Sequence, residues 1–239
     1  MLSSKVLISL IAPTFPEAVF FRKIPKKLPR KVVALTIDDV PARDCESDLC
    51  TRPILEVIDS HNQSAKANFK ATFFVITDHL PENSRIVGEL AAKGHEIGNH
   101  GTTDHRHADL SPEEFEQEFL KAHELLSKSG AHPIRWFRPG QGFYNDNMIS
   151  TLRTTGQELG YEDRFALASM IPFDTRAFLD DPQFTLKNVS RFTFPGSILV
   201  LHGGLKEQVS NTVEVLKALL PSLQKQGYEV VTLSKLFSE

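Results

Sequence analysis

The chain has 239 residues, which is enough for one large α/β domain or two small ones. Its hydrophobic content of 41% and charged content of 24% are those of an ordinary globular protein. A formal net charge of −3 argues against nucleic acid or an anionic membrane surface as the main partner. The sequence also has no apolar run long enough to span a bilayer.

The first thirty residues form a lead that we expect to lie outside the main domain. Lys5 and the apolar residues 6–12 have the composition of a weak secretory signal, but no clear small-residue cleavage site follows them. A first helix packed on the domain, or an unstructured lead, is favoured over a signal, and residues 25–31 are expected to form an exposed linker. We therefore predict a lead and linker (1–30) before a single domain (31–239). A cytoplasmic location is favoured, with secretion as the alternative.

Residues 32–37 are almost all apolar or β-branched, which is the pattern of a strand buried on both faces. This strand runs into two adjacent carboxylates, Asp38 and Asp39, and is stopped by Pro41. Two like charges at the mouth of a buried strand cost stability unless a cation or a hydrogen-bond donor satisfies them. A bound metal is the natural cause. The alternative is that one aspartate caps the next segment and the other faces water.

The two cysteines, Cys45 and Cys50, lie in a polar insertion (residues 44–51) directly after the acidic pair. Two closely spaced thiols exclude a disulfide framework and a four-cysteine zinc site. They are either free thiols or one loop-closing disulfide, and the sequence does not separate these alternatives.

Helical and strand patterns then alternate along the chain. The clearest helix opens with a capping box made by Ser111 and Glu114, has Pro112 at its first position, and ends at Gly130. Further helices are expected at residues 52–61, 82–93, 147–159 and 211–226. Further strands are expected at residues 71–76, 95–100, 134–137, 164–169, 197–201 and 228–233.

Strands that alternate with helices predict a parallel sheet covered by helices. About seven strands suit either a β/α barrel or an open doubly wound sheet. Polar residues recur at the carboxyl ends of four different strands, and this favours the barrel: Asp38 and Asp39, His100, Arg138 and His202. We therefore predict an α/β fold, a distorted (β/α) TIM-like barrel with about seven parallel strands.

The loop after the third strand is dense in possible metal ligands. His100 and Asp104 are four residues apart, so one turn of the loop could bring both to a single ion. With Asp39 they would form an Asp-His-Asp set that leaves open positions for water, as a catalytic metal requires. His105 competes for the third position. The alternative is a polar surface loop whose histidines only form hydrogen bonds.

Two further polar residues lie at strand ends. His202 follows a buried strand and precedes two glycines, so a substrate can approach it closely, although a hydrogen-bonded core histidine would show the same pattern. Arg138 leaves a buried strand and requires an anion there, for which the carboxylates at the same face are candidates. An ordinary surface arginine is the alternative.

Four segments, in this order and spacing, resemble the motifs of the polysaccharide deacetylases (carbohydrate esterase family four). They are residues 36–39 (Thr-Ile-Asp-Asp), 98–100 (Gly-Asn-His), 137–140 (Phe-Arg-Pro-Gly) and 199–202 (Leu-Val-Leu-His). The resemblance covers roughly residues 31–237, so it is far more specific than any single motif. It implies a distorted β/α barrel and a divalent metal, with zinc expected and cobalt, nickel or manganese as alternatives. It also implies hydrolysis of N-acetyl groups on an amino-sugar polymer or oligomer of the chitin or peptidoglycan type.

The resemblance assigns a role to each catalytic position. Asp38 matches the general base, Arg138 the arginine that orients this base, and His202 the general acid. We expect a backbone N–H near Gly140 or Gly142 to help stabilise the oxyanion of the tetrahedral intermediate.

The resemblance also assigns Asp39 and His100 as metal ligands, and here the chain departs from the family. The family's second motif usually ends in a histidine where this chain has Asp104. A carboxylate adds negative charge and is a harder ligand than imidazole, so the metal preference is expected to differ.

A second departure lies in residues 173–178, which resemble the family's fourth motif. Ala177 stands where an aspartate is usual, and Phe178 stands where a tryptophan is usual. Arg138 would then lose a partner, which Asp174 is placed to supply.

Two alternatives to a carbohydrate deacetylase stay open. One is an amidase acting on a small cyclic amide or imide, and the other is a catalytically silent carbohydrate-binding protein. In each of them the partner is a small molecule or a carbohydrate and not nucleic acid. The oligomeric state is not predicted.

Overall fold

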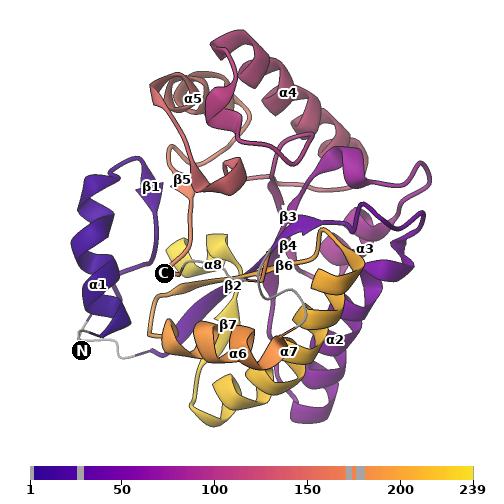
Figure 1. Ribbon diagram of the computed structural model, residues 1–239, viewed down its shortest axis with the longest axis vertical. Coiled ribbons are helices and arrows are strands. Elements are labelled where there is room, and N and C mark those ends of the chain that lie inside the picture. The colour runs from indigo at the N-terminus through magenta and orange to yellow at the C-terminus, as the bar shows by residue number, and fades with distance from the viewer. Residues whose placement is uncertain (1–2, 26–29, 171–173, 176–180, 239) are drawn as a thin grey trace.

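The computed structural model describes residues 3–25, 30–170, 174–175 and 181–238. Strands and helices alternate along the chain, and every ladder between named strands in this part is parallel (Figure 1). The larger sheet contains, in order, β4 (Glu96–Asn99), β3 (Ala71–Val75), β2 (Val32–Val40) and β6 (Ile198–His202), with β7 (Glu229–Val231) paired to the start of β2. A second ladder consists of β1 (Ala18–Val19) and β5 (Phe165–Ala166).

Isolated contacts join the two ladders into a ring. Asn99 at the end of β4 forms a parallel bridge with Phe137, whose carbonyl accepts the N–H of Ala166 in β5 at 3.1 Å. On the other side, the N–H of Ser169 donates to the carbonyl of Ile198 in β6 at 2.9 Å. The predicted α/β fold with parallel strands is confirmed, and the barrel is distorted because single bridges stand where ladders would close it. The strand expected at residues 134–137 is wrong in extent, because it is reduced to the bridge at Phe137.

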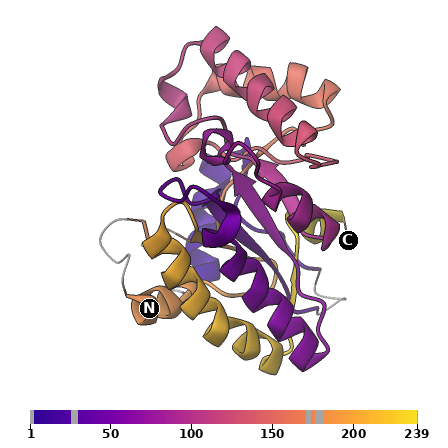
Figure 2. The same ribbon diagram turned by 90° about the vertical axis from the view of Figure 1, so that its right-hand side faces the viewer.

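The helices cover the outside of this ring. Helices α2 (Arg52–Ala65) and α7 (Lys206–Lys225) lie side by side on one flank, with α6 (Pro182–Arg191) beside α7 (Figure 2). Helices α4 (Pro112–Lys128) and α5 (Asp146–Thr151) pack together at the opposite end of the molecule (Figure 1). The remaining α-helices of the described residues are α1 (Ser4–Ile11), α3 (Ile86–Ala92) and α8 (Leu233–Ser238).

Helix boundaries follow local chemistry. The capping box predicted at the start of α4 is confirmed, since Ser111 Oγ accepts the N–H of Glu114 and Glu114 Oε2 accepts the N–H of Ser111. Helix α2 continues past its predicted end at residue 61. The helix ends at Ala65, where Lys66 in the left-handed conformation caps it. The Asn62 side chain forms hydrogen bonds with the backbone N–H and carbonyl of Phe69.

Aromatic packing fixes the strand end that carries Arg138. The ring of Phe137 lies 5.5 Å from the rings of Phe115 and Phe119, both on α4, and 6.0 Å from that of Phe165 on β5. All four side chains are fully buried. Such aromatic pairs contribute about 0.5–1.5 kcal/mol each beyond the area they bury, so α4 and β5 hold this strand end from two sides.

The N-terminal lead contributes to the fold. Its segment β1 pairs with β5, and Ser4 in α1 bonds the carbonyl of Arg191 at the end of α6. The domain boundary at residue 30 stays a prediction, and residues 26–29 of the expected linker lie outside the described residues. Within the described ranges, no helix combines the length and the apolar run needed to cross a membrane.

Of the two alternatives for the cysteines, the structure shows the disulfide. Cys45 and Cys50 are bonded across a separation of five residues. The bond closes the insertion directly after the acidic pair. The same insertion is tied to its surroundings by Asp48, which accepts hydrogen bonds from Ser84 Oγ and the N–H of Arg85.

Candidate active site

The acid and the base predicted from the sequence lie side by side at the top of two neighbouring strands. Asp38 on β2 and His202 on β6 are direct register partners in a parallel ladder. Paired residues in such a ladder point to the same face, and adjacent strands are about 4.8 Å apart. Both side chains are almost completely buried. The two groups can therefore act on one small substrate group.

A backbone irregularity turns the second carboxylate. Successive residues of a regular strand point to opposite faces, so Asp38 and Asp39 would be separated by the sheet. Asp39 instead adopts φ 64°, and the register between β2 and β3 shifts between Ile37 and Val40. A non-glycine residue in this region is strained, and such strain is typical of functional sites.

The two glycines after His202 make room for this irregularity. A Cβ on Gly204 would lie 2.6 Å from Asp39 Cβ, and one on Gly203 would lie 2.8 Å from Val40 Cγ1. The sequence interpretation placed these glycines against the substrate, whereas the structure places them against β2.

His79 holds the irregular segment from the other side, and the sequence interpretation assigned it no functional role. Its Nδ1 lies 3.1 Å from the carbonyl oxygen of Asp39 and 3.0 Å from that of Pro41. Because carbonyls only accept, Nδ1 carries the proton and donates to both. No sequence pattern marks this contact, since His79 and Asp39 are forty residues apart.

Arg138 is buried and makes polar contacts in three directions. Its Nη1 donates to Asp38 Oδ1 at 2.5 Å and to Thr36 Oγ1 at 2.8 Å, while Nε donates to the carbonyl of Ala166 at 2.8 Å. The guanidinium also lies 4.1 Å from the centre of the Phe74 ring. A buried arginine held in this way fixes one oxygen of Asp38.

The two ring nitrogens of His100 have different partners, and Nε2 is the one that faces Asp39. Its Nδ1 is 2.7 Å from the carbonyl of Arg138, so Nδ1 must donate. The neutral ring then faces Asp39 Oδ1 with the lone pair of Nε2, at 3.1 Å. Two acceptors at this distance require a proton or a cation. Burial acts against the charged ring, yet the neighbouring Asp39 and Asp38 raise the pKa of His100, and these two ligand types suit a divalent metal.

His202 is paired with Asp174. Its Nδ1 lies 3.0 Å from Asp174 Oδ1, and its backbone N–H donates to Asp174 Oδ2 at 3.0 Å. Burial lowers the pKa of His202, but Asp174 outweighs it and raises this pKa to about 10. The sequence interpretation offered Asp174 as a partner for Arg138, and this is corrected here: Asp174 binds His202, and Arg138 binds Asp38. Phe173, Ala177 and Phe178 of the same motif lie outside the described residues.

Among the described residues, Asp104 does not form a group of converging ligand atoms with Asp39 and His100. Its carboxylate lies 3.3 Å from Arg43 Nη1, and both side chains are about half exposed. Its role as third metal ligand stays a prediction.

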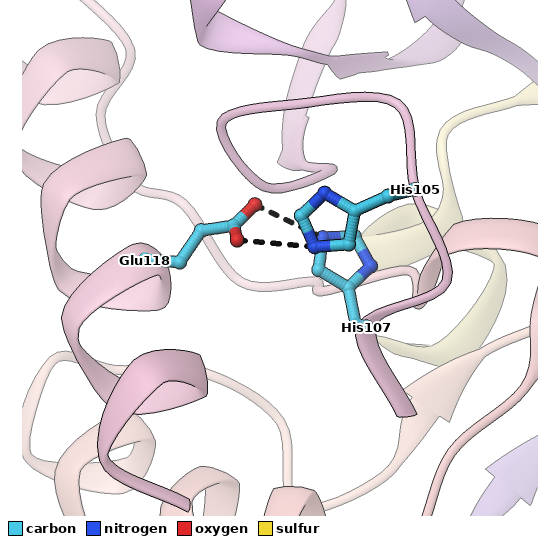
Figure 3. A group of neighbouring side chains, drawn as sticks. All are labelled: His105, His107 and Glu118. Carbon is cyan, nitrogen blue, oxygen red and sulfur yellow. Dashed lines mark ion pairs between the residues drawn. The ribbon is translucent and has the colours of Figure 1, made fainter. Parts of the chain in front are cut away.

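In the described part of the chain, one group of three side chains could hold a metal ion, and it is a different one (Figure 3). The ligand atoms of His105, His107 and Glu118 all lie within 4.8 Å of one another. His105 competed for the third ligand position in the sequence analysis, whereas His107 and Glu118 were not expected there.

A backbone N–H near Gly140 or Gly142 was expected to stabilise the oxyanion, and the amides of these two glycines are used within the protein. The N–H of Gly140 donates to His107 Nδ1 at 2.7 Å, and that of Gly142 donates to the carbonyl of Pro139 at 3.0 Å. Between them, Gln141 adopts φ 58°. Its N–H finds no acceptor among the described residues, so it is the remaining donor of this turn.

Known proteins resemble this chain in sequence and in structure. The model of the polysaccharide deacetylase family matches residues 25–160. A peptidoglycan-N-acetylglucosamine deacetylase of Bacillus cereus is 31% identical over 207 residues, covering 86% of this chain and 88% of the relative. A chitooligosaccharide deacetylase of Bradyrhizobium is 29% identical over 219 residues, covering 85% and 90%.

The solved structure of a peptidoglycan N-acetylglucosamine deacetylase, in complex with 4-naphthalen-1-yl-N-oxidanyl-benzamide, superposes with a TM-score of 0.77. It is 25% identical and covers 95% of each chain. The motifs, the strand-end residues and these similarities agree. This chain belongs to the polysaccharide deacetylase family.

Proposed function

We propose that this protein is a metal-dependent deacetylase that hydrolyses N-acetyl groups on a peptidoglycan- or chitin-type sugar chain and releases acetate. The observation that carries this proposal is the register pairing of Asp38 with His202, directly beside the Asp39–His100 pair. The named activities of the two curated relatives support the same substrate class.

Asp39 and His100 are the residues that would hold the metal. Their facing acceptor atoms fit a divalent cation, and Asp104 is the predicted third ligand. A bound divalent cation, which we propose to be zinc, supplies the Lewis acidity that polarises the acetamide carbonyl and acidifies a water molecule.

The side chains of the site divide the proton transfers between them. Arg138 holds Oδ1 of Asp38, which leaves Oδ2 to accept the proton of the attacking water. Asp174 holds Nδ1 of His202, which leaves Nε2 to donate a proton to the departing amine. The N–H of Gln141 is the backbone donor left for the oxyanion.

The test is acetate release from N-acetylglucosamine oligomers by Asp38→Asn. The variant keeps the size of the side chain but cannot accept the proton, so turnover should fall by about 10²- to 10⁴-fold. Near-full turnover in Asp38→Asn would refute this assignment of the base. Metal analysis of the purified chain accompanies the assay. Turnover of cyclic amides without metal would instead support the amidase alternative, and sugar binding without turnover would support the silent one.

The disulfide bears on the compartment. Disulfides persist in oxidising compartments and are rare in the cytosol. We therefore propose that the protein acts outside the cytoplasm, which is the alternative that the sequence analysis had ranked second. Alkylation of the protein in intact cells, before any reductant is added, tests this: two alkylated cysteines would contradict it.

A further inference from the structure

The side chain of His107 lies between two loops that directly follow the predicted active-site residues His100 and Arg138. We call residues 101–107 the histidine loop and residues 139–143 the Gly140 turn. A Cβ on Gly101 would lie 2.2 Å from His107 Nε2, and a Cβ on Gly140 would lie 2.9 Å from His107 Nδ1. The ring is 1% exposed and also packs against Phe137 at 5.4 Å. Each loop therefore touches the imidazole directly.

The hydrogen bonds of this ring fix its protonation. The N–H of Gly140 points at Nδ1 of His107, 2.7 Å away. A backbone N–H can only donate, so Nδ1 carries a lone pair and the proton sits on Nε2. That nitrogen faces Glu118 Oε1 at 3.3 Å. The imidazole of His107 therefore lies between the N–H of Gly140 in the Gly140 turn and the carboxylate of Glu118 on helix α4.

This protonation speaks against a metal between His105, His107 and Glu118, although their atoms converge. A metal binds an unprotonated nitrogen, and a ligating histidine donates its other ring N–H to a second partner. His107 shows the reverse arrangement. Its Nδ1 accepts the N–H of Gly140, and the protonated nitrogen is Nε2, which faces Glu118.

Glu118 gathers several donors of the histidine loop. Its Oε1 accepts the N–H of Thr102 at 2.8 Å and lies near His107 Nε2, while Oε2 lies 3.2 Å from His105 Nε2 (Figure 3). Burial alone would raise the pKa of Glu118, but the His107 ring, the N–H of Thr102 and the His105 ring together lower this pKa. The residue next to it, Phe119, is fully buried, so α4 gives the carboxylate a rigid base.

We propose that Glu118 and His107 are positioning residues that hold the histidine loop and the Gly140 turn together around the active site. His100 directly precedes the first loop, and Arg138 directly precedes the second. A shift of one loop against the other would therefore displace His100 from Arg138 and Asp38. This role in turnover rests on the proposed function.

Glu118→Gln is the first variant. Its carboxamide oxygen can take the place of Oε1 and still accept from Thr102. The NH₂ group then stands where Oε2 faced His105 Nε2, and the negative charge that attracts both imidazoles is lost. Hydrogen exchange followed by mass spectrometry should show exchange about tenfold faster or more in both loops, because the carboxylate charge that attracts the two rings is lost. Glu124→Gln is the matched control, since Glu124 lies on the same helix and its ion pair among the described residues is with exposed Lys128. Unchanged exchange in Glu118→Gln would overturn the proposal.

His107→Leu is the second variant, of similar volume but without either ring nitrogen. It should loosen the Gly140 turn, whereas Thr102 keeps its bond to Glu118. This difference between the two variants would not arise from a general loss of stability.

Kinetics supply the functional readout. In folded protein, kcat should fall by about 10- to 100-fold in Glu118→Gln with KM nearly unchanged, since displacement of catalytic groups by about 1 Å costs this much. The metal content per chain should stay that of the wild type. Loss of an ion from Glu118→Gln would overturn the proposal and make the cluster a metal site. If the wild type releases no acetate, the proposed function fails, while hydrogen exchange still decides whether the two loops are held in this way.

Discussion

Two histidine–carboxylate pairs flank the active site, and the pKa values of their imidazoles shift in opposite directions. At the end of β6, His202 faces Asp174 at 3.0 Å, and in the histidine loop His107 faces Glu118 at 3.3 Å. The pKa of His202 is raised to about 10 by Asp174, against the effect of burial. The pKa of His107 is lowered, because burial outweighs Glu118.

The difference follows from where one backbone N–H goes. In the first pair, the N–H of His202 donates to the carboxylate of Asp174, and both ring nitrogens can carry protons. In the second pair, the N–H of Gly140 donates to the ring of His107, which excludes a second proton there. A histidine beside a carboxylate therefore gives a proton donor at His202 and a neutral imidazole at His107.

The largest expected effect comes from exchanging the two histidines for asparagine. His202→Asn removes the general acid, so kcat for acetate release should fall by about 10²- to 10⁴-fold. His107→Asn keeps an acceptor near Gly140 and removes only positioning, so its loss should not exceed about 10²-fold. Both are measured on N-acetylglucosamine oligomers. Equal losses in the two variants would break the comparison.

His95 is a second buried histidine that resembles His107, because its Nδ1 also accepts a backbone N–H, from Ala71 at 3.1 Å. No described carboxylate forms a hydrogen bond or ion pair with it. Burial and Lys70 lower its pKa from 6.5 to about 4, although Asp59 acts in the opposite direction. The unfolded chain binds this proton first, so the stability contribution is complete above pH 6.5 and is lost as the pH falls toward 4. The loss should reach about 3 kcal/mol.

Urea unfolding at pH 7.5 and pH 4.5 measures this effect, with His95→Asn as the reference. The asparagine can accept from Ala71 but does not titrate. The free energy of unfolding should therefore fall further in the wild type than in the variant. A parallel decline in both proteins would show that His95 does not carry it.

The sequence predicted the strand ends well, and for a physical reason. Buried parallel strands are continuous apolar runs, so Asp38, His100 and His202 stand out where these runs stop. Their common face follows from the parallel topology alone. The family and its deacetylase class followed from the same segments, and the comparisons confirm both.

The sequence could not predict what depends on backbone geometry and distant contacts. The residue types at positions 38 and 39 do not predict that Asp39 adopts φ 64°, or that His79 donates a hydrogen bond to the Asp39 carbonyl. The contact of Glu118 with His107 joins a helix to a loop eleven residues before it, and an acidic residue on an amphipathic helix ordinarily faces water. The capping box predicted where α4 begins, but it did not indicate that Glu118 faces the histidine loop.

Asp174→Asn tests the His202–Asp174 pair and should have an intermediate effect, which is on the pH dependence of kcat. The amide no longer stabilises the imidazolium, so the pKa of His202 falls. A general acid works only while protonated, and the alkaline limb of the pH profile of kcat should therefore move to lower pH. Activity at pH 9 relative to pH 7 is the measure. An unshifted alkaline limb would mean that another group gives the proton to the amine.

The smallest expected effect concerns Asp104, a carboxylate that has neither the burial nor the backbone donors of Asp174. Its exposed pair with Arg43 should contribute less than about 1 kcal/mol, so Arg43→Gln should barely change the free energy of unfolding in urea. If Asp104 is the third metal ligand, Asp104→Asn should weaken metal binding about tenfold or more, whereas Arg43→Gln should not, because it leaves the carboxylate available. Titration of the metal-free chain with Zn²⁺ separates the two variants. Equal affinity in both would remove Asp104 from the ligand set and leave His105 as the nearest histidine in the loop to test.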